Sequence, residues 1–180
     1  PDPLALPDGF TPDLAGVEAF CRLVLDAALP TAAAVKPNLA FYEAFGSAGL
    51  AALERLRALI PDEVPVVIDA KRGDVPNTSE RIAVALFDRL GADAVTVNPY
   101  LGEAGIAPLL ERADRFAYVL CRTSNDGAGE LQDLEVDGEP LWARVARRVA
   151  EWGPGGTAGL VVGATAPAEL RAIRGVAPGL

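Results

Sequence analysis

The sequence predicts an α/β fold built on a parallel sheet. Short apolar runs alternate with segments in which apolar residues recur at helical spacing, and the order of strand then helix repeats five times. The run over residues 66–68 consists of three β-branched residues, which is typical of a strand covered on both faces. Parallel strands need crossover connections, usually helices, so the alternation predicts right-handed βαβ units. It is equally compatible with an open sheet and with a closed barrel.

The first part of the chain contains three predicted helical segments and one strand. Residues 11–13 place a capping threonine before a proline, which is typical of a helix start, and apolar residues then recur to about residue 27. Residues 32–36 form a short apolar run that ends in charge, as expected for an inner strand. A helical turn is predicted over 39–45, followed by a helix whose apolar residues span 50–60.

The middle of the chain continues the alternation after the strand at 66–68. Asn77, with Glu80 three residues later, is the N-cap signal of a helix that Gly91 ends. A β-rich run at 94–97 predicts the next strand, and a helix follows over about 106–112.

The last part of the chain has two more strand-helix pairs. The strands are predicted at 116–121 and 159–163, and the helices at 141–152 and from 165 to about 174. Residues 124–140 form the longest stretch without clear periodicity. A loop of that length is usually functional or mobile.

Length and composition favour a single globular domain over residues 1–180. The chain is 51% hydrophobic and 23% charged, which excludes a disordered protein. Its net charge of −9 argues against a nucleic-acid partner, because the surface as a whole repels a polyanion. No apolar run has the length of a membrane span and the first residues do not resemble a signal peptide, so the expectation is a cytoplasmic protein without a membrane partner.

The residue types present restrict the chemistry. The chain has no histidine, which excludes His-based triads and His-ligated metal sites and leaves Asp, Glu, Lys, Tyr and Cys for proton transfer. Cys21 and Cys121 lack the spacing of a disulfide or metal pair, and both are interpreted as buried thiols. No Gly-rich dinucleotide or phosphate-loop fingerprint is present, and no metal site is expected.

The strongest candidate site follows the strand at 66–68. Asp69 and Lys71 are two residues apart, so they point to the same side if the chain stays extended, and Asp74 follows after a glycine. The cluster is predicted to form a strand-to-helix loop, and ligands bind at such loops in parallel α/β folds. A solvated cluster of salt bridges is the alternative interpretation of these charges.

Residues 69–74, Asp-Ala-Lys-Arg-Gly-Asp, resemble the Asp-x-Lys-x-x-Asp signature of orotidine 5′-phosphate decarboxylase, in the form of the bacterial branch. Four further segments resemble successive strand ends of the same family, in the same order along the chain. They are residues 35–38, 98–102, 123–125 and 163–167. The resemblance implies a (β/α)8 barrel, here with about five βα units. It also implies that the first strand, with an Asp that helps bind ribose, and the last two units, with the Gln and Arg that grip phosphate, are missing.

The resemblance also implies roles for single residues. Lys71 is expected to stabilise the carbanion formed on decarboxylation and to protonate it, while Asp69 lies beside the substrate carboxylate and orients the lysine. Asp74 completes an alternating Asp-Lys-Asp-Lys network with Lys36, which also holds ribose hydroxyls. Carboxylates on both sides of an ammonium group keep it charged.

Other site residues follow from the same comparison. Asp74 and Thr78 match the family positions that reach across a dimer interface, which implies a homodimer with shared sites. Ser124 matches the loop that contacts the pyrimidine, although a loop serine is most often only a turn residue. Residues 98–102 are equally compatible with a simple turn.

Two other functions remain open on the sequence. One is a Mg²⁺-dependent relative with an enediolate intermediate, such as hexulose-phosphate synthase or ketogulonate-phosphate decarboxylase. The other is a non-catalytic nucleotide-binding protein. The leading interpretation is a cofactor-independent decarboxylase that converts orotidine 5′-monophosphate to UMP.

Overall fold

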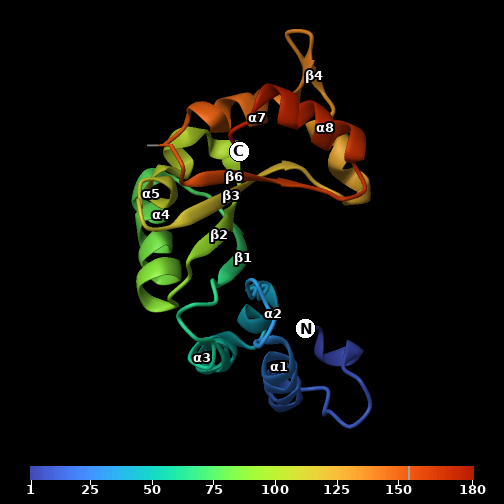
Figure 1. Cartoon of the computed structure of the whole chain (residues 1–180), viewed down its shortest axis with the longest axis vertical. Helices are drawn as coiled ribbons and strands as arrows, with labels where there is room; N and C mark the ends of the chain where they lie inside the picture. The colour runs from blue at the N-terminus through green and yellow to red at the C-terminus, as the bar shows by residue number, and fades with distance from the viewer. Residues whose placement is uncertain (154) are drawn as a thin grey trace.

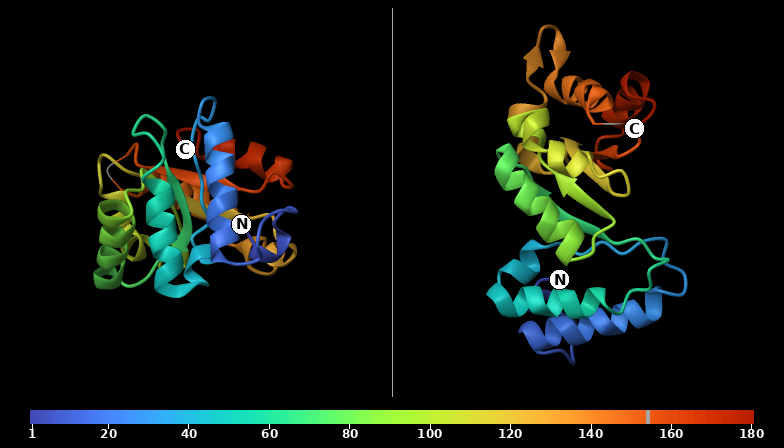
Figure 2. Two further views of the ribbon diagram at one scale, coloured as in Figure 1. Left: turned by 90° about the horizontal axis from the view of Figure 1, so that it is seen from below. Right: turned by 90° about the vertical axis from the view of Figure 1, so that its left-hand side faces the viewer.

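The computed structural model describes residues 1–153 and 155–180 and has the shape of a crescent (Figure 1). Helices form its outer side and strands its inner side, and the right-hand view of Figure 2 shows the N-terminal and the C-terminal helices at opposite ends of the molecule. The α-helices are α1 (Leu14–Ala28), α2 (Ala40–Glu43), α3 (Gly46–Arg57), α4 (Pro76–Ala83), α5 (Ala107–Leu110), α6 (Gly129–Gln132), α7 (Leu141–Glu151) and α8 (Pro167–Val176). Helices α1 to α3 make up one arm of the crescent, and α7 and α8 lie on the other.

Four strands form the main sheet in the order β1-β2-β3-β6, and every neighbouring pair is parallel. They are β1 (Val67–Arg72), β2 (Ala94–Val97), β3 (Phe116–Arg122) and β6 (Ala158–Val162). The predicted α/β class with a parallel sheet is confirmed. Four of the five predicted strands lie within a few residues of their expected positions.

The fifth predicted strand, residues 32–36, does not form as a continuous strand. It continues the sheet beside β1 through two isolated parallel bridges, Val35 with Val66 and Asn38 with Asp69. The backbone nitrogen of Val35 donates to Pro65, and Pro37 accepts from the nitrogen of Asp69. Pro37 has no N–H group to donate in return, so the ladder is interrupted at this residue.

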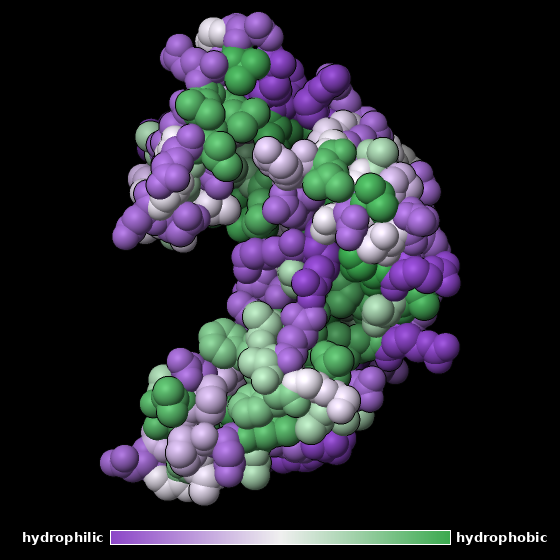
Figure 3. Space-filling view, turned by 180° about the vertical axis from the view of Figure 1, so that it is seen from behind, coloured by the Kyte–Doolittle hydropathy of each residue, from purple (hydrophilic) through white to green (hydrophobic). Residues whose placement is uncertain are grey.

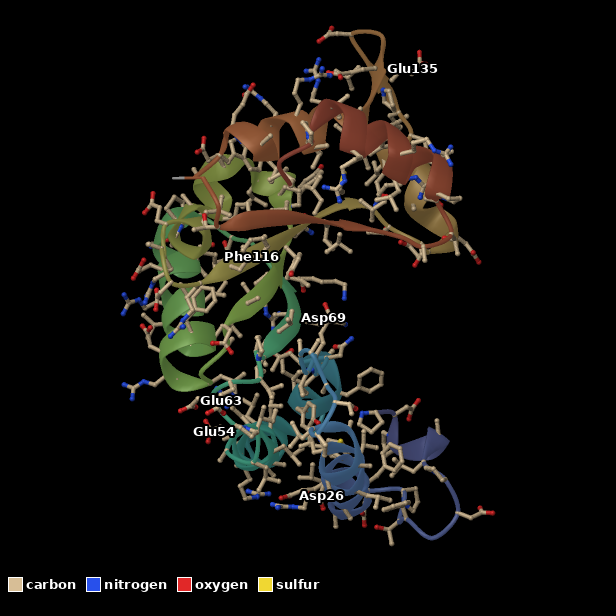
Figure 4. All side chains as sticks on the ribbon, in the orientation of Figure 1. Asp26, Glu54, Glu63, Asp69, Phe116 and Glu135 are labelled. Carbon is tan, nitrogen blue, oxygen red and sulfur yellow. The ribbon has the colours of Figure 1, made fainter. Side chains whose placement is uncertain are left out.

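Strand β1 extends further than predicted. It runs to Arg72, so Asp69, Lys71 and Arg72 belong to the strand itself and not to a loop after it. The register with β2 shifts between Ile68 and Arg72, which marks a bulge. The end of this strand borders the concave side of the crescent, where Figure 4 labels Asp69, and the Lys71 side chain there is 49% exposed.

Helix starts are the least accurate of the predicted features. The N-cap of α1 is Asp13, whose Oδ1 accepts from the Gly16 nitrogen at 2.9 Å, while the hydroxyl of Thr11 donates to the same carboxylate. Helix α4 begins at Pro76 after Val75, without a side-chain cap, so Asn77 is not the N-cap. A proline with preset φ is enough to start this helix. It continues as a π-helical segment, η2 (Val84–Arg89), and Gly91 ends it with φ +69°, as predicted.

Residues 124–140 are not a featureless loop. They contain a 3₁₀ turn η5 (Asp126–Ala128), helix α6, and an antiparallel pair of two-residue strands, β4 (Glu135–Val136) and β5 (Glu139–Pro140). Each element is too short to show a hydrophobic period, which is why the sequence does not reveal it. Other 3₁₀ turns are η1 (Pro3–Ala5), η3 (Pro99–Leu101) and η4 (Glu103–Gly105).

The main core lies between the strands and the outer helices. Its fully buried side chains come from β1, β2 and β3 and from the helices that cover them, and include Ile68, Val95, Val119, Phe87 and Leu109. Within the described residues, no helix is both long and apolar enough to cross a membrane.

The two cysteines differ in environment. Cys121 is buried as predicted, and burial raises the pKa of its thiol to about 12. Cys21 is only half-buried, and its sulfur lies 3.4 Å from the Tyr42 hydroxyl.

Candidate active site

The predicted site residues lie at one edge of the sheet. Because the strands are parallel, their carboxyl ends meet at the same edge, and Lys36, Lys71 and Ser124 all lie near such an end. Figure 4 shows Asp69 on the concave side of the crescent, away from Glu54 and Glu63 on the N-terminal arm. Figure 3 shows this hollow from behind, with hydrophilic atoms gathered at its centre and apolar atoms on both arms.

Asp69 is the centre of the cluster. Its Oδ1 lies 2.6 Å from Nζ of Lys71, and its Oδ2 lies 3.2 Å from Nζ of Lys36. The hydroxyl of Thr96 donates to Oδ1 at 2.8 Å. The Asp69 side chain is 11% exposed, whereas those of Lys36 and Lys71 are 56% and 49% exposed. One largely buried carboxylate therefore holds two ammonium groups that remain open to a ligand.

The charge of Asp69 is favoured by its partners. Partial burial alone raises the pKa of this carboxyl group, but the hydrogen bonds from Lys71 and Thr96 and the charge of Lys36 outweigh it. The net result is a pKa below the ordinary value. Asp69 is therefore ionised at neutral pH and keeps both lysines in place.

The backbone at Lys71 is not extended, contrary to the premise of the sequence argument. Lys71 has φ +49°, the left-handed region that residues with a Cβ rarely adopt. The bulge of β1 produces this conformation, and the Lys71 N–H donates to the Thr96 hydroxyl at 2.9 Å instead of to a neighbouring backbone. Asp69 and Lys71 are close together, as predicted. The cause is the bulge in β1 and not the alternation of side chains along an extended strand.

Gly73 is required by a close backbone approach. A Cβ built at this position lies 2.3 Å from the carbonyl oxygen of Asn98, a distance that no side chain tolerates. The Asn98 nitrogen donates to the Arg72 carbonyl at 2.8 Å, so the loops after β1 and β2 are in direct contact. The Arg72 side chain forms an ion pair with Glu43 of α2, which connects the end of β1 to that helix.

Asp74 and Thr78 lie just beyond this contact. Asp74 Oδ1 accepts from the Val75 nitrogen at 2.6 Å, and its own nitrogen donates to the Gly105 carbonyl. Among the described residues of this single chain, Asp74 makes no ion pair with either lysine. Its membership of an Asp-Lys-Asp-Lys network therefore stays a prediction.

Ser124 is exposed in the loop after β3, and its neighbours order that loop. The Gln132 side chain accepts from the Thr123 nitrogen at 2.8 Å and donates to the Thr123 hydroxyl. A Cβ at Gly163, at the end of β6, lies within 3.0 Å of the Ser124 backbone. Ser124 is thus held against β6 at the same sheet edge, without a direct contact to Asp69 among the described residues.

Sequence reasoning missed Thr96 and Gln132. The signal for Thr96 was a single hydroxyl in an otherwise apolar strand, 94–97, and no local signal marks Gln132. The described residues contain no group of three or more acidic, cysteine or histidine side chains placed to hold a metal ion.

The comparison with known proteins identifies the family. The sequence profile of the "Orotidine 5′-phosphate decarboxylase / HUMPS family" matches residues 12–179, nearly the whole chain. The chain belongs to this family. Two relatives named orotidine 5′-phosphate decarboxylase, from Herpetosiphon aurantiacus and Roseiflexus castenholzii, are each 47% identical to it, over 96% and 99% of its length.

Solved structures of the family have the same fold. The Leishmania donovani OMP decarboxylase superposes with a TM-score of 0.89 at 40% identity, over 93% of this chain and 67% of that one. The α/β sheet is therefore part of the barrel expected for orotidine 5′-phosphate decarboxylases. The chain spans 66% of the length of the Herpetosiphon and Roseiflexus relatives.

Proposed function

We propose that this chain carries the decarboxylation site of an orotidine 5′-phosphate decarboxylase, which converts orotidine 5′-monophosphate to UMP and carbon dioxide without a cofactor. The observation that carries the proposal is the contact of Lys71 and Lys36 with one ionised carboxylate at the carboxyl edge of the sheet. Family membership and the printed names of the relatives support the same reaction.

The reaction needs charge stabilisation and a proton. When the bond between ring carbon C6 and the substrate carboxylate breaks, its electron pair stays on C6 and carbon dioxide leaves. The Lys71 ammonium stabilises this negative charge and then donates a proton to C6, which yields UMP. Water returns a proton to the amine. Asp69 fixes the ammonium group at a distance of 2.6 Å, so Lys71 is already oriented before the charge develops.

The remaining residues bind the substrate in this proposal. Lys36 reaches the ribose hydroxyls, and Ser124 contacts the edge of the pyrimidine from the loop after β3. Both side chains are exposed at the carboxyl edge of the sheet and are open to a ligand.

We further propose a homodimer in which Asp74 and Thr78 enter the partner's site. Among the described residues of one chain, Asp74 forms no ion pair with either lysine, and its loop contacts the loop after β2 through Gly105. Val75, Tyr100 and Leu101 are exposed apolar side chains on these two loops, as expected for an interface between copies.

Assays of purified protein test the reaction. We expect UMP to form from orotidine 5′-monophosphate, and the rate to be unchanged by EDTA. Strict dependence on Mg²⁺ together with activity on a sugar phosphate would instead favour the hexulose-phosphate synthase type. Binding of UMP without any turnover would favour a nucleotide-binding protein.

Mixing two inactive variants tests the shared site. A hybrid dimer of Lys71→Ala and Asp74→Ala chains has one site with both defects and one site with neither. Random mixing should therefore restore about a quarter of the wild-type activity. If each site is built from one chain, the mixture stays as inactive as its components.

A further inference from the structure

The bulge in β1 has a single residue opposite it. Val95 of β2 pairs with Ile68, and Val97 pairs with Arg72. Asp69, Ala70 and Lys71 therefore all lie opposite Thr96. These three residues include both members of the candidate catalytic pair, so Thr96 is where β2 meets the site.

The Thr96 hydroxyl makes two directional hydrogen bonds within this bulge. It accepts from the Lys71 backbone N–H at 2.9 Å and donates to Asp69 Oδ1 at 2.8 Å. The directions are unambiguous because an N–H group only donates and an ionised carboxylate only accepts. One hydroxyl thus connects the backbone of the lysine to the side chain of the aspartate.

Among the described residues, the Thr96 hydroxyl has no hydrogen-bond partner outside the bulge. Thr96 is 6% exposed, and the other residues of β2, Ala94, Val95 and Val97, are buried and apolar. A hydroxyl buried without partners costs free energy, so its two bonds to the bulge are what make it tolerable there. One of these bonds also satisfies the backbone N–H of Lys71, which no longer pairs with a neighbouring strand, at a residue whose left-handed φ is unfavourable.

We propose that Thr96 is a positioning residue of the decarboxylation site. Its hydroxyl holds the Asp69 carboxylate and the left-handed Lys71 backbone in register, so that Asp69 aims the ammonium group at the reacting carbon. Thr96 does this without touching the substrate. The proposal rests on the proposed function for its kinetic consequence, but its structural content concerns Asp69 and Lys71 alone.

Removal of the hydroxyl in the full chain tests the proposal. Thr96→Val keeps the branched shape and the apolar packing, and we expect it to lower kcat by about 10- to 100-fold, since small misplacements at a reacting centre cost this much. The KM should change far less, because no substrate contact is removed. Thr96→Ser keeps the hydroxyl and should restore most of kcat.

A second readout does not depend on activity. A carboxyl-carbon NMR titration of Asp69 should show a higher pKa in Thr96→Val than in the wild type or Thr96→Ser, because one donor to the carboxylate is lost. Amide exchange at Lys71 should accelerate in the same variant. Lys36 and Lys71 are the charged groups in contact with Asp69, and they are unchanged in all three proteins.

Thr157 provides a matched control. It is also a buried threonine, 5% exposed, and its hydroxyl has no partner among the described residues. Thr157→Val should leave the Asp69 pKa, the Lys71 exchange rate and kcat as they are in the wild type. If Thr96→Val does not fold, Thr96→Ala takes its place in these experiments, because it removes the same hydroxyl and has a smaller side chain.

The outcomes separate this proposal from the proposed function. An unchanged Asp69 pKa and unchanged Lys71 exchange in the hydroxyl-free variant overturn the positioning role, whatever the activity. A failure of Thr96→Ser to restore kcat overturns it as well. A wild-type chain without decarboxylase activity refutes the proposed function, while the titration and exchange data still decide whether Thr96 holds the pair.

Discussion

Lys36 and Lys71 hold opposite oxygens of the same carboxylate, at 3.2 Å from Oδ2 and 2.6 Å from Oδ1 of Asp69. They are the only lysines in the chain, and every other one of its sixteen basic side chains is an arginine. The lysine ammonium is a compact point charge that can lose its proton, whereas the guanidinium keeps its proton under all ordinary conditions. The only two side-chain amines of the chain, which can act as acids, therefore lie in one site.

Amine-directed labelling should therefore report on this site alone among the side chains. We expect a lysine-specific reagent to modify Lys36 and Lys71, both about half exposed, and to abolish decarboxylation. Saturating UMP should slow both modifications, as followed by peptide mass spectrometry. Equal labelling rates with and without UMP would show that the nucleotide binds elsewhere.

Replacing Lys71 with alanine should abolish the chemistry while leaving the fold intact. It removes both the stabilising charge and the proton donor, so we expect kcat to fall by about 10³-fold or more. Lys36→Ala is the comparison, with its main effect expected on KM because this lysine binds ribose in the proposed site. UMP binding by calorimetry checks that each variant retains a site. Near-normal turnover by Lys71→Ala would end the proposed mechanism.

Gly73→Ala should damage the site through the backbone. The new methyl group would meet the Asn98 carbonyl at 2.3 Å, so the loops after β1 and β2 must separate. We expect a loss of about 1–3 kcal/mol in the free energy of unfolding, together with reduced activity.

Gly175→Ala in α8 is the matched control for that change. A Cβ at Gly175 meets nothing within 4 Å, and alanine is the better helix former. This variant should be more stable by about 0.5–1 kcal/mol in a urea titration. A Gly73→Ala protein as stable and active as Gly175→Ala would contradict the close contact.

Acid should weaken the attachment of α1 to α3 through Glu18. A hydrogen bond from Arg55, opposed by desolvation and helped by Arg22, lowers the pKa of Glu18 from its ordinary 4.5 to about 2. Because the pKa is lower in the folded state, ionised Glu18 contributes stability above pH 4.5. That contribution is lost as the pH falls from about 4.5 to about 2.

Glu18→Gln should accordingly be less stable than the wild type at pH 7, with a difference that shrinks over this pH range. Urea unfolding at several pH values measures it. Glu151→Gln is the control, since the pair of Glu151 with Arg148 is exposed on both sides and should contribute little. A difference for Glu18→Gln that does not depend on pH would contradict the assigned pKa.

The fold class could be predicted because hydrophobic period is a local property. The apolar runs at 94–97 and 116–121 and the helix at 141–152 could each be found from their own residues, and the structure has all three. Prediction failed where the competing effects are local but subtle. Thr11 and Asp13 are both residue types that favour an N-cap. Asp13 is the cap in the structure, because its carboxylate accepts a hydrogen bond from the Gly16 nitrogen.

The sequence alone determined the parallel α/β architecture and the set of charged residues at its strand ends, because both are written in residue type and spacing. The tertiary structure alone decided how those charges meet. Register between β1 and β2 creates the bulge, places Thr96 beneath it and turns Lys71 back onto Asp69. The two contacts of Thr96 join residues that are 25 and 27 positions apart in the chain, and no local pattern encodes the geometry between them.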